Sequence, residues 1–80
     1  MATLTDNAEA VLLALHDAGE ADIYDLAGSV GAGPKAIQEC VRELDRAKLV
    51  VVSERGDRMR CTPAGDDHAR ALNERRQGRR

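Results

Sequence analysis

Apolar residues recur at helical spacing near the start of the chain. Four of them follow the i, i+3, i+4, i+7 pattern of a helix with one buried face: Ala8, Val11, Leu12 and Leu15. Thr5 or Asp6 can cap the N-terminus of such a helix, and Gly19 suits a left-handed stop at its end. The pattern therefore predicts a core-facing helix over residues 5–18.

Two more apolar stripes follow, separated by the segment GAGP at residues 31–34. Residues 22–29 predict a short helix that Asp22 can cap, reached through an extended link at residues 20–21. The glycines of GAGP permit a tight turn, and its proline takes the first position of a third helix, residues 34–48. The expected buried side of this third helix consists of Ile37, Cys40, Val41 and Leu44. The two helices should therefore meet at a tight corner.

Residues 49–62 are apolar at first and then alternate between basic and apolar positions, which is typical of a β-hairpin. A turn at Gly56-Asp57, closed by a loop of two or four residues, places every second side chain on the same face. The inner face then holds Val50, Val52, Met59 and Cys61. The outer face holds Arg55, Arg58 and Arg60.

A last helix is expected over residues 63–75, opened by Thr62 and Pro63. Its candidates for contact with the core are Ala64, His68, Ala71 and Leu72. At 80 residues the chain is long enough for one modest core and too short for two, so we expect a single domain over residues 1–75. Residues 76–80 should form a basic flexible tail.

The composition limits what this domain can do. Tyr24 is the only aromatic residue, so the core must be aliphatic, and neither a large ligand pocket nor a cofactor is expected. Cys40 and Cys61 lack the CxxC or histidine spacing of a metal site. They are interpreted as buried thiols; a redox sensor, the alternative, would need an exposed thiol with a lowered pKa. Neither an apolar run of about 18 residues nor a signal leader occurs, which predicts a cytoplasmic protein without a membrane span.

Charge is distributed unevenly along the chain, although its net value is only −2. Residues 1–34 carry six acidic side chains and neither lysine nor arginine. Residues 35–80 carry twelve basic side chains against eight acidic ones. Such asymmetry indicates one side that faces a polyanion and another that faces water or a protein partner.

The order of helix, helix, tight turn, helix, β-hairpin and helix resembles the winged helix-turn-helix of small MarR-like and PadR-like regulators. The fragments that carry the resemblance are Leu26-Ala27, the turn at Gly31 to Gly33, Leu44 with Leu49-Val50, and Thr62-Pro63 with Gly65. The resemblance covers about residues 5–72. It implies an α+β, mostly helical fold with three helices, a β-hairpin wing and a C-terminal helix. It further implies a transcriptional regulator, expected to be a repressor, that binds double-stranded DNA.

In that arrangement helix 34–48 would enter the major groove and hairpin 50–62 would be the wing. The polar side of the helix carries Lys35, Gln38, Glu39, Arg42 and Arg46. Glutamine can pair with adenine and arginine with guanine, whereas Glu39 would repel phosphate unless it accepts from cytosine or pairs with Arg42 or Lys35. On the wing, Arg55, Arg58 and Arg60 suit phosphate or minor-groove contacts. We expect the two sets to form one continuous cationic surface.

The sequence departs from the family pattern in two ways. The usual glycine before the closing leucine is Lys48, which predicts the loss of a left-handed helix stop. Long terminal helices for dimerisation are absent, so a homodimer would have to form through Leu13 of the first helix or Leu72 of the last.

Other interpretations of the same residues remain open. The polar side of the third helix can be a solvated face, and arginines on the hairpin can simply protect an edge strand from aggregation. Alternatively, the chain can be a winged-helix adaptor that docks its acidic N-terminal half on a basic protein. An enzyme is not expected, because the sequence lacks a nucleophile triad, a paired-carboxylate site, a phosphate loop and a metal cluster.

Overall fold

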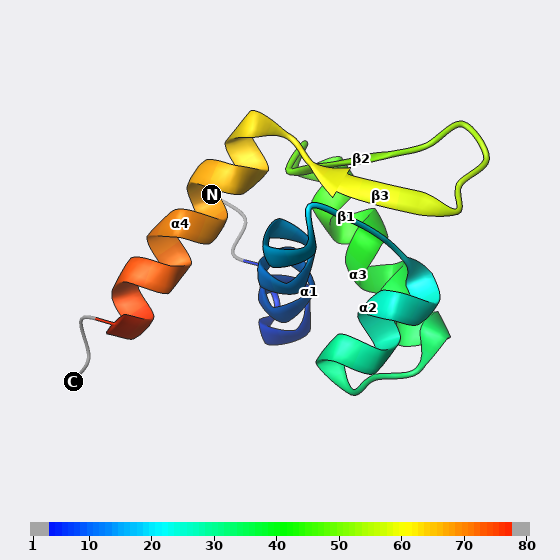
Figure 1. Ribbon diagram of the computed structural model, residues 1–80, viewed down its shortest axis with the longest axis horizontal. Helices are drawn as coiled ribbons and strands as arrows, with labels where there is room; N and C mark the ends of the chain where they lie inside the picture. Colours follow the sequence, from blue (N-terminus) through cyan, green and yellow to red (C-terminus); the bar gives the residue numbers. More distant parts are fainter. Residues whose placement is uncertain (1–3, 78–80) are drawn as a thin grey trace.

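The computed structural model describes residues 4–77, with side chains as far as residue 75. Over this range four helices lie against one small antiparallel sheet, and α4 and the hairpin turn lie at opposite ends of the molecule (Figure 1). The elements are α1 (Asp6–Ala18), β1 (Glu20–Asp22), α2 (Ile23–Val30), α3 (Pro34–Arg46), β2 (Val50–Val52), β3 (Arg58–Cys61) and α4 (Pro63–Gln77). The predicted winged helix-turn-helix is confirmed.

The ends of α1 and α2 form as the sequence predicts. The Thr5 hydroxyl accepts a hydrogen bond from the Ala8 N–H at 3.2 Å, and the Asp22 carboxylate accepts one from the Asp25 N–H at 2.8 Å. Each bond satisfies a backbone donor that the first helical turn leaves free. At the other end of α1, Gly19 has a φ of 85°, a conformation that glycine adopts without strain.

The exit from α3 differs from the expectation. Lys48 adopts the left-handed conformation itself, with a φ of 61°. The Leu49 N–H donates to the Leu44 carbonyl at 2.9 Å, the hydrogen bond that follows a left-handed residue, usually glycine, at such a helix end. The predicted loss of the left-handed stop is therefore wrong. The strain of a lysine here, about 1–2 kcal/mol, is offset because the turn delivers Val50 into the core, where it is 2% exposed.

The sheet contains a strand that the hairpin pattern does not predict. Its order is β1-β3-β2, so residues 20–22 pair with β3, whereas the sequence predicts only an extended link at residues 20–21. The Ser53 N–H donates to the Arg58 carbonyl at 2.8 Å, which closes the hairpin with a four-residue loop. Val52 then lies opposite Met59, and the predicted inner face of the hairpin is confirmed.

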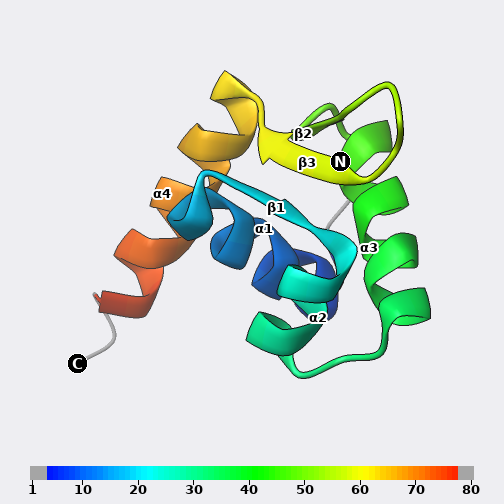
Figure 2. The same ribbon diagram turned by 45° about the vertical axis from the view of Figure 1, so that its right-hand side comes forward.

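The core is aliphatic and centres on α1, which packs against α2, α3 and α4, with β1 crossing over it (Figure 2). The position of α4 depends on Gly65, since a Cβ at this residue would lie 1.9 Å from the Leu49 carbonyl oxygen. Gly65 therefore faces inward, and Ala69 and Leu72 follow it at i+4 and i+7. Ala64 and Ala71 are exposed, so their predicted core contacts are wrong.

A side-chain contact joins the last helix, α4, to the first, α1. His16 Nδ1 of α1 lies 2.8 Å from Asp66 Oδ1 of α4. The helix continues to Gln77, two residues beyond its predicted end, and residues 78–80 of the predicted tail lie outside the described part. None of the helices described is long and apolar enough to cross a membrane.

Candidate nucleic-acid interface

The two faces of α3 are sharply separated. Ile37 and Leu44 are at most 1% exposed and fix the helix to the core. All five polar residues predicted on the other side are exposed: Lys35, Gln38, Glu39, Arg42 and Arg46. The ion pairs recorded among residues 4–75 involve other side chains, so the charges on this side of α3 are available to a partner. Glu39, three positions before Arg42, likewise takes part in none of these ion pairs.

A groove separates α3 from the wing. One hollow of about 300 Å³ is lined by Ile23, Gln38, Val41, Arg42, Asp45, Val52, Gly56 and Met59. A second hollow of about 250 Å³ shares Ile23, Gln38 and Gly56 with the first and extends to Asp22, Tyr24, Pro34 and Asp57. Because the two hollows adjoin, we refer to them together as the α3–wing groove. Gln38 and Arg42 therefore project beside the wing.

The charge inside the α3–wing groove is mostly negative. Arg42 and Asp45 line the first hollow, and Asp22 and Asp57 line the second, so the groove holds three carboxylates and one guanidinium. Asp22 accepts the capping bond of α2, and Asp57 accepts a hydrogen bond from the Ser53 hydroxyl at 2.9 Å. A phosphate group would meet repulsion inside the groove, so attraction for a polyanion must come from the exposed rim of α3. Sequence periodicity did not bring these three acids together, since Asp22 caps α2, Asp45 lies on α3 and Asp57 lies in the loop between β2 and β3.

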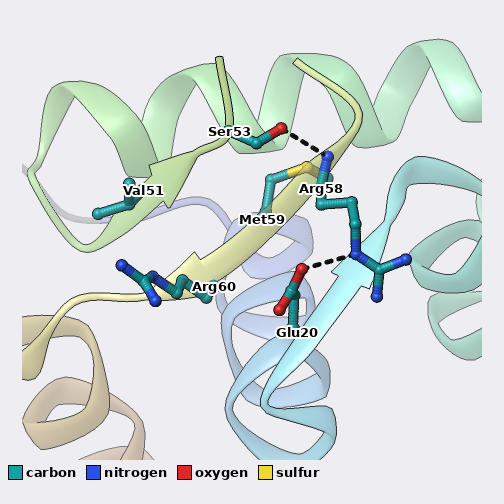
Figure 3. Close-up of a pocket in the computed structure, with 6 residues that line it drawn as sticks. All are labelled: Glu20, Val51, Ser53, Arg58, Met59 and Arg60. Atoms are coloured by element: carbon teal, nitrogen blue, oxygen red, sulfur yellow. Dashed lines mark hydrogen bonds and ion pairs between the residues drawn. The ribbon is translucent and has the colours of Figure 1, made fainter. Parts of the chain in front are cut away.

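The arginines of the hairpin lie on a different surface. Arg58 and Arg60 are exposed on the face of β3 opposite the buried Met59 side chain. They line a hollow of about 230 Å³ with Glu20, Val51, Ser53 and Met59 (Figure 3). Arg55 is exposed in the loop between β2 and β3. The basic residues therefore form two surfaces, the rim of α3 and the outer face of the sheet, and the predicted continuous cationic surface is wrong.

One wing arginine is already paired within the chain. Arg58 Nε lies 2.6 Å from Glu20 Oε1 of β1, and Figure 3 shows the two side chains meeting across the strands. This hydrogen bond and the nearby carboxylates of Glu20, Asp22 and Asp25 raise the pKa of Arg58. Sequence reasoning missed the pair because it depends on the pairing of β1 with β3, across 38 positions of the chain.

The cysteines do not have the properties of a redox sensor. Cys40 is buried, and burial, followed by the charges of Glu43 and Glu39, raises the pKa of its thiol. Burial, followed by the charge and hydrogen bond of Asp66, raises the pKa of Cys61 to about 11. A raised pKa disfavours the thiolate, the reactive form of cysteine, and therefore opposes the redox-sensor alternative. Among the described residues, no group of three or more His, Cys, Asp or Glu side chains could hold a metal ion.

The two apolar residues expected to form a dimer surface pack, wholly or in part, within the chain. Leu13 is half-buried and packs against the core, and Leu72 is 7% exposed. The large apolar side chains that residues 4–75 leave exposed are Tyr24, at 76%, and Val51, at 43%. Tyr24 was not among the predicted site residues, although its place in the α3–wing groove puts it beside Gln38.

Comparison with known proteins yields similarity in structure alone. No family model and no curated relative matches the sequence. The MarR family transcriptional regulator SPO1453 from Silicibacter pomeroyi DSS-3 superposes with a TM-score of 0.80 and 25% identity, over 90% of this chain and 54% of that one. BpsR from Bordetella bronchiseptica, whose DNA binding is regulated by 6-hydroxynicotinic acid, has a TM-score of 0.78 and 25% identity. The match covers 86% of this chain and 53% of that one.

Ligand-free NadR has a TM-score of 0.84 at 23% identity, covering 94% of this chain and 56% of that protein. NadR is also known in complex with 4-hydroxyphenylacetate. The chain thus has the winged-helix fold of MarR family regulators, and it spans little more than half the length of these neighbours.

Proposed function

We propose that this MarR-like chain is a transcriptional regulator that binds double-stranded DNA, with α3 in the major groove and residues 50–62 as the wing. The observation that carries the proposal is the division of α3 into a buried apolar side and an exposed polar side whose charges are not paired within residues 4–75. A recognition helix needs both properties, since one side fixes its position and the other reaches the bases. The DNA binding named for BpsR supports the same function.

Within this function the polar side chains take different roles. Gln38 and Arg42, beside the wing, suit base edges in the major groove. The basic groups at the ends and on the wing suit phosphates, namely Lys35, Arg46, Arg55, Arg58 and Arg60. Glu39, with its charge unpaired, selects for a cytosine amine and against close phosphates.

We further infer a homodimer that acts as a repressor in the cytoplasm. Twelve basic against eight acidic side chains in residues 35–80 give one copy only modest attraction for DNA. Two copies on a palindromic or repeated site would multiply their affinities. Leu13 is half-buried and Leu72 is buried, so exposed positions such as Ala64 and Ala71 on the outward side of α4 would have to add to the dimer surface. Light scattering with and without duplex measures the stoichiometry.

The decisive experiment measures binding to random and genomic duplexes by fluorescence anisotropy across a salt series. Arg42→Ala should erode the preference for particular sequences, whereas Arg60→Ala should weaken binding to all duplexes alike. Arg70→Ala is the matched control, because this arginine lies on α4 and pairs with Asp67 at 3.2 Å. If the unmodified chain binds no duplex, the DNA-binding function is refuted; if Arg42→Ala and Arg60→Ala bind every duplex as the unmodified chain does, the placement of the interface on α3 and the wing is refuted.

A specific observation favours a second candidate, a protein-binding adaptor. The carboxylates of Asp22, Asp45 and Asp57 in the α3–wing groove would attract a basic peptide. Asp45→Asn separates the two functions, since Asp45 is exposed on α3 and the change keeps its size. A DNA-binding protein should bind duplexes more tightly after this change, whereas an adaptor should bind an arginine-rich peptide less tightly.

A further inference from the structure

Tyr24 occupies a position that the packing of the domain does not explain. It is the only aromatic residue of the chain and is 76% exposed, near the start of α2. Leu26, at 1% exposure, already fixes α2 to the core, and Asp22 already caps it. The stability of α2 therefore does not depend on the phenol ring.

The residues around Tyr24 indicate that its ring lies in a binding groove and does not simply face solvent. Its side chain lines the α3–wing groove together with Gln38 of α3 and Asp57 of the wing loop. Three elements distant in sequence thus converge on this ring, at the end of the groove where α3 begins. Tyrosine is suited to such an interface because it offers apolar area and a hydrogen-bonding hydroxyl at little entropic cost.

The charges at this end of the groove select the kind of contact. Asp22 and Asp57 repel phosphate, and the polar groups beside them that can donate without charge are the Tyr24 hydroxyl and the Gln38 amide. Such donors hydrogen-bond to sugar or phosphate oxygens at the edge of a DNA groove. The contact formed here would be neutral, in contrast with those of the arginines on the wing.

We propose that Tyr24 is a DNA contact of the α3–wing groove, its hydroxyl donating to a sugar oxygen of the DNA backbone beside the base that Gln38 reads. The proposal rests on the DNA-binding function proposed above. It has a distinctive consequence, because a neutral donor displaces no counterion. Loss of the hydroxyl should therefore weaken binding without changing its dependence on salt.

Tyr24→Phe removes the hydroxyl and keeps the ring. Anisotropy titrations should give a dissociation constant raised about 2- to 10-fold for every duplex, with an unchanged slope of log affinity against log salt. Ser29→Ala is the matched control, since it removes an exposed hydroxyl near the other end of the same helix and should leave affinity unchanged. Thermal melts should coincide for all three proteins, because both side chains are exposed.

The unmodified chain supplies an independent measurement. With one tyrosine and no tryptophan or phenylalanine, its intrinsic emission reports on Tyr24 alone. Added duplex should quench this emission along the same curve as the anisotropy. Constant emission at saturating duplex, or equal affinity of Tyr24→Phe, would overturn the placement of Tyr24 and leave the DNA-binding function standing. Absence of any duplex binding by anisotropy would refute both.

Discussion

The exposed side of α3 and the outer face of the wing are both rich in basic residues, yet their charges are used differently. On α3, Arg42 and Lys35 have no ion-pair partner within residues 4–75. On the wing, Arg58 is held by Glu20 at 2.6 Å. A helix face presents side chains from one short stretch of sequence, whereas a strand also meets the side chains of whichever strand pairs with it. The difference teaches that basic residues on a sheet cannot be counted as DNA contacts until their neighbours are known.

The base of the wing packs against α4, where Gly65 lies against the Leu49 backbone just before β2. Gly65→Ala tests this contact and has the largest expected effect. The added Cβ would clash with the Leu49 carbonyl oxygen at the base of the hairpin, so we expect a loss of about 3 kcal/mol or more in the free energy of unfolding. Urea denaturation followed by circular dichroism measures it. Gly28→Ala on α2 is the control, because nothing lies within 4 Å of its Cβ position and alanine favours the helix. Equal stability of the two variants would show that α4 can shift away from Leu49.

The unequal use of the two surfaces should appear in the affinity for DNA. Arg42→Ala should cost about 1–3 kcal/mol on the preferred duplex, since a free guanidinium can pair with guanine in two places. Arg58→Ala should cost less, because its guanidinium must exchange Glu20 for phosphate before it contributes. Anisotropy titrations with one preferred and one random duplex compare the affinities of the two variants. An equal loss for both variants would remove the distinction between the two surfaces.

The smallest expected effect concerns the ion pair itself. Glu20→Gln removes the carboxylate that holds Arg58 and should raise affinity for all duplexes a few-fold at low salt, with no change in sequence preference. The slope of log affinity against log salt should steepen by about 0.9, as one more phosphate is neutralised. Glu74→Gln, an exposed glutamate on α4, is the control. Unchanged binding of Glu20→Gln would mean that Arg58 already contacts phosphate while paired.

Most of the helical architecture could be predicted because it depends on neighbours in the chain. The caps at Thr5 and Asp22, the glycine-proline turn and the buried stripe of α3 all formed as expected. Predictions failed where distant segments decide. Gly65 set the orientation of α4 through the Leu49 backbone and turned Ala69 inward in place of Ala71. The cost of a left-handed lysine at residue 48 was offset by the burial of Val50, a tertiary contact that local propensity cannot predict.

The sequence alone determined the order of the helices and the hairpin and which residues of α3 face outward, because helical periodicity and capping act within a few residues. Tertiary structure decided the pairing of β1 with β3, the ion pair of Arg58 with Glu20, and the acidic lining around Gln38 and Tyr24. These features bring together side chains from segments far apart in the chain. Their positions depend on how strands pair and helices pack, and periodicity within a single segment carries no information about either.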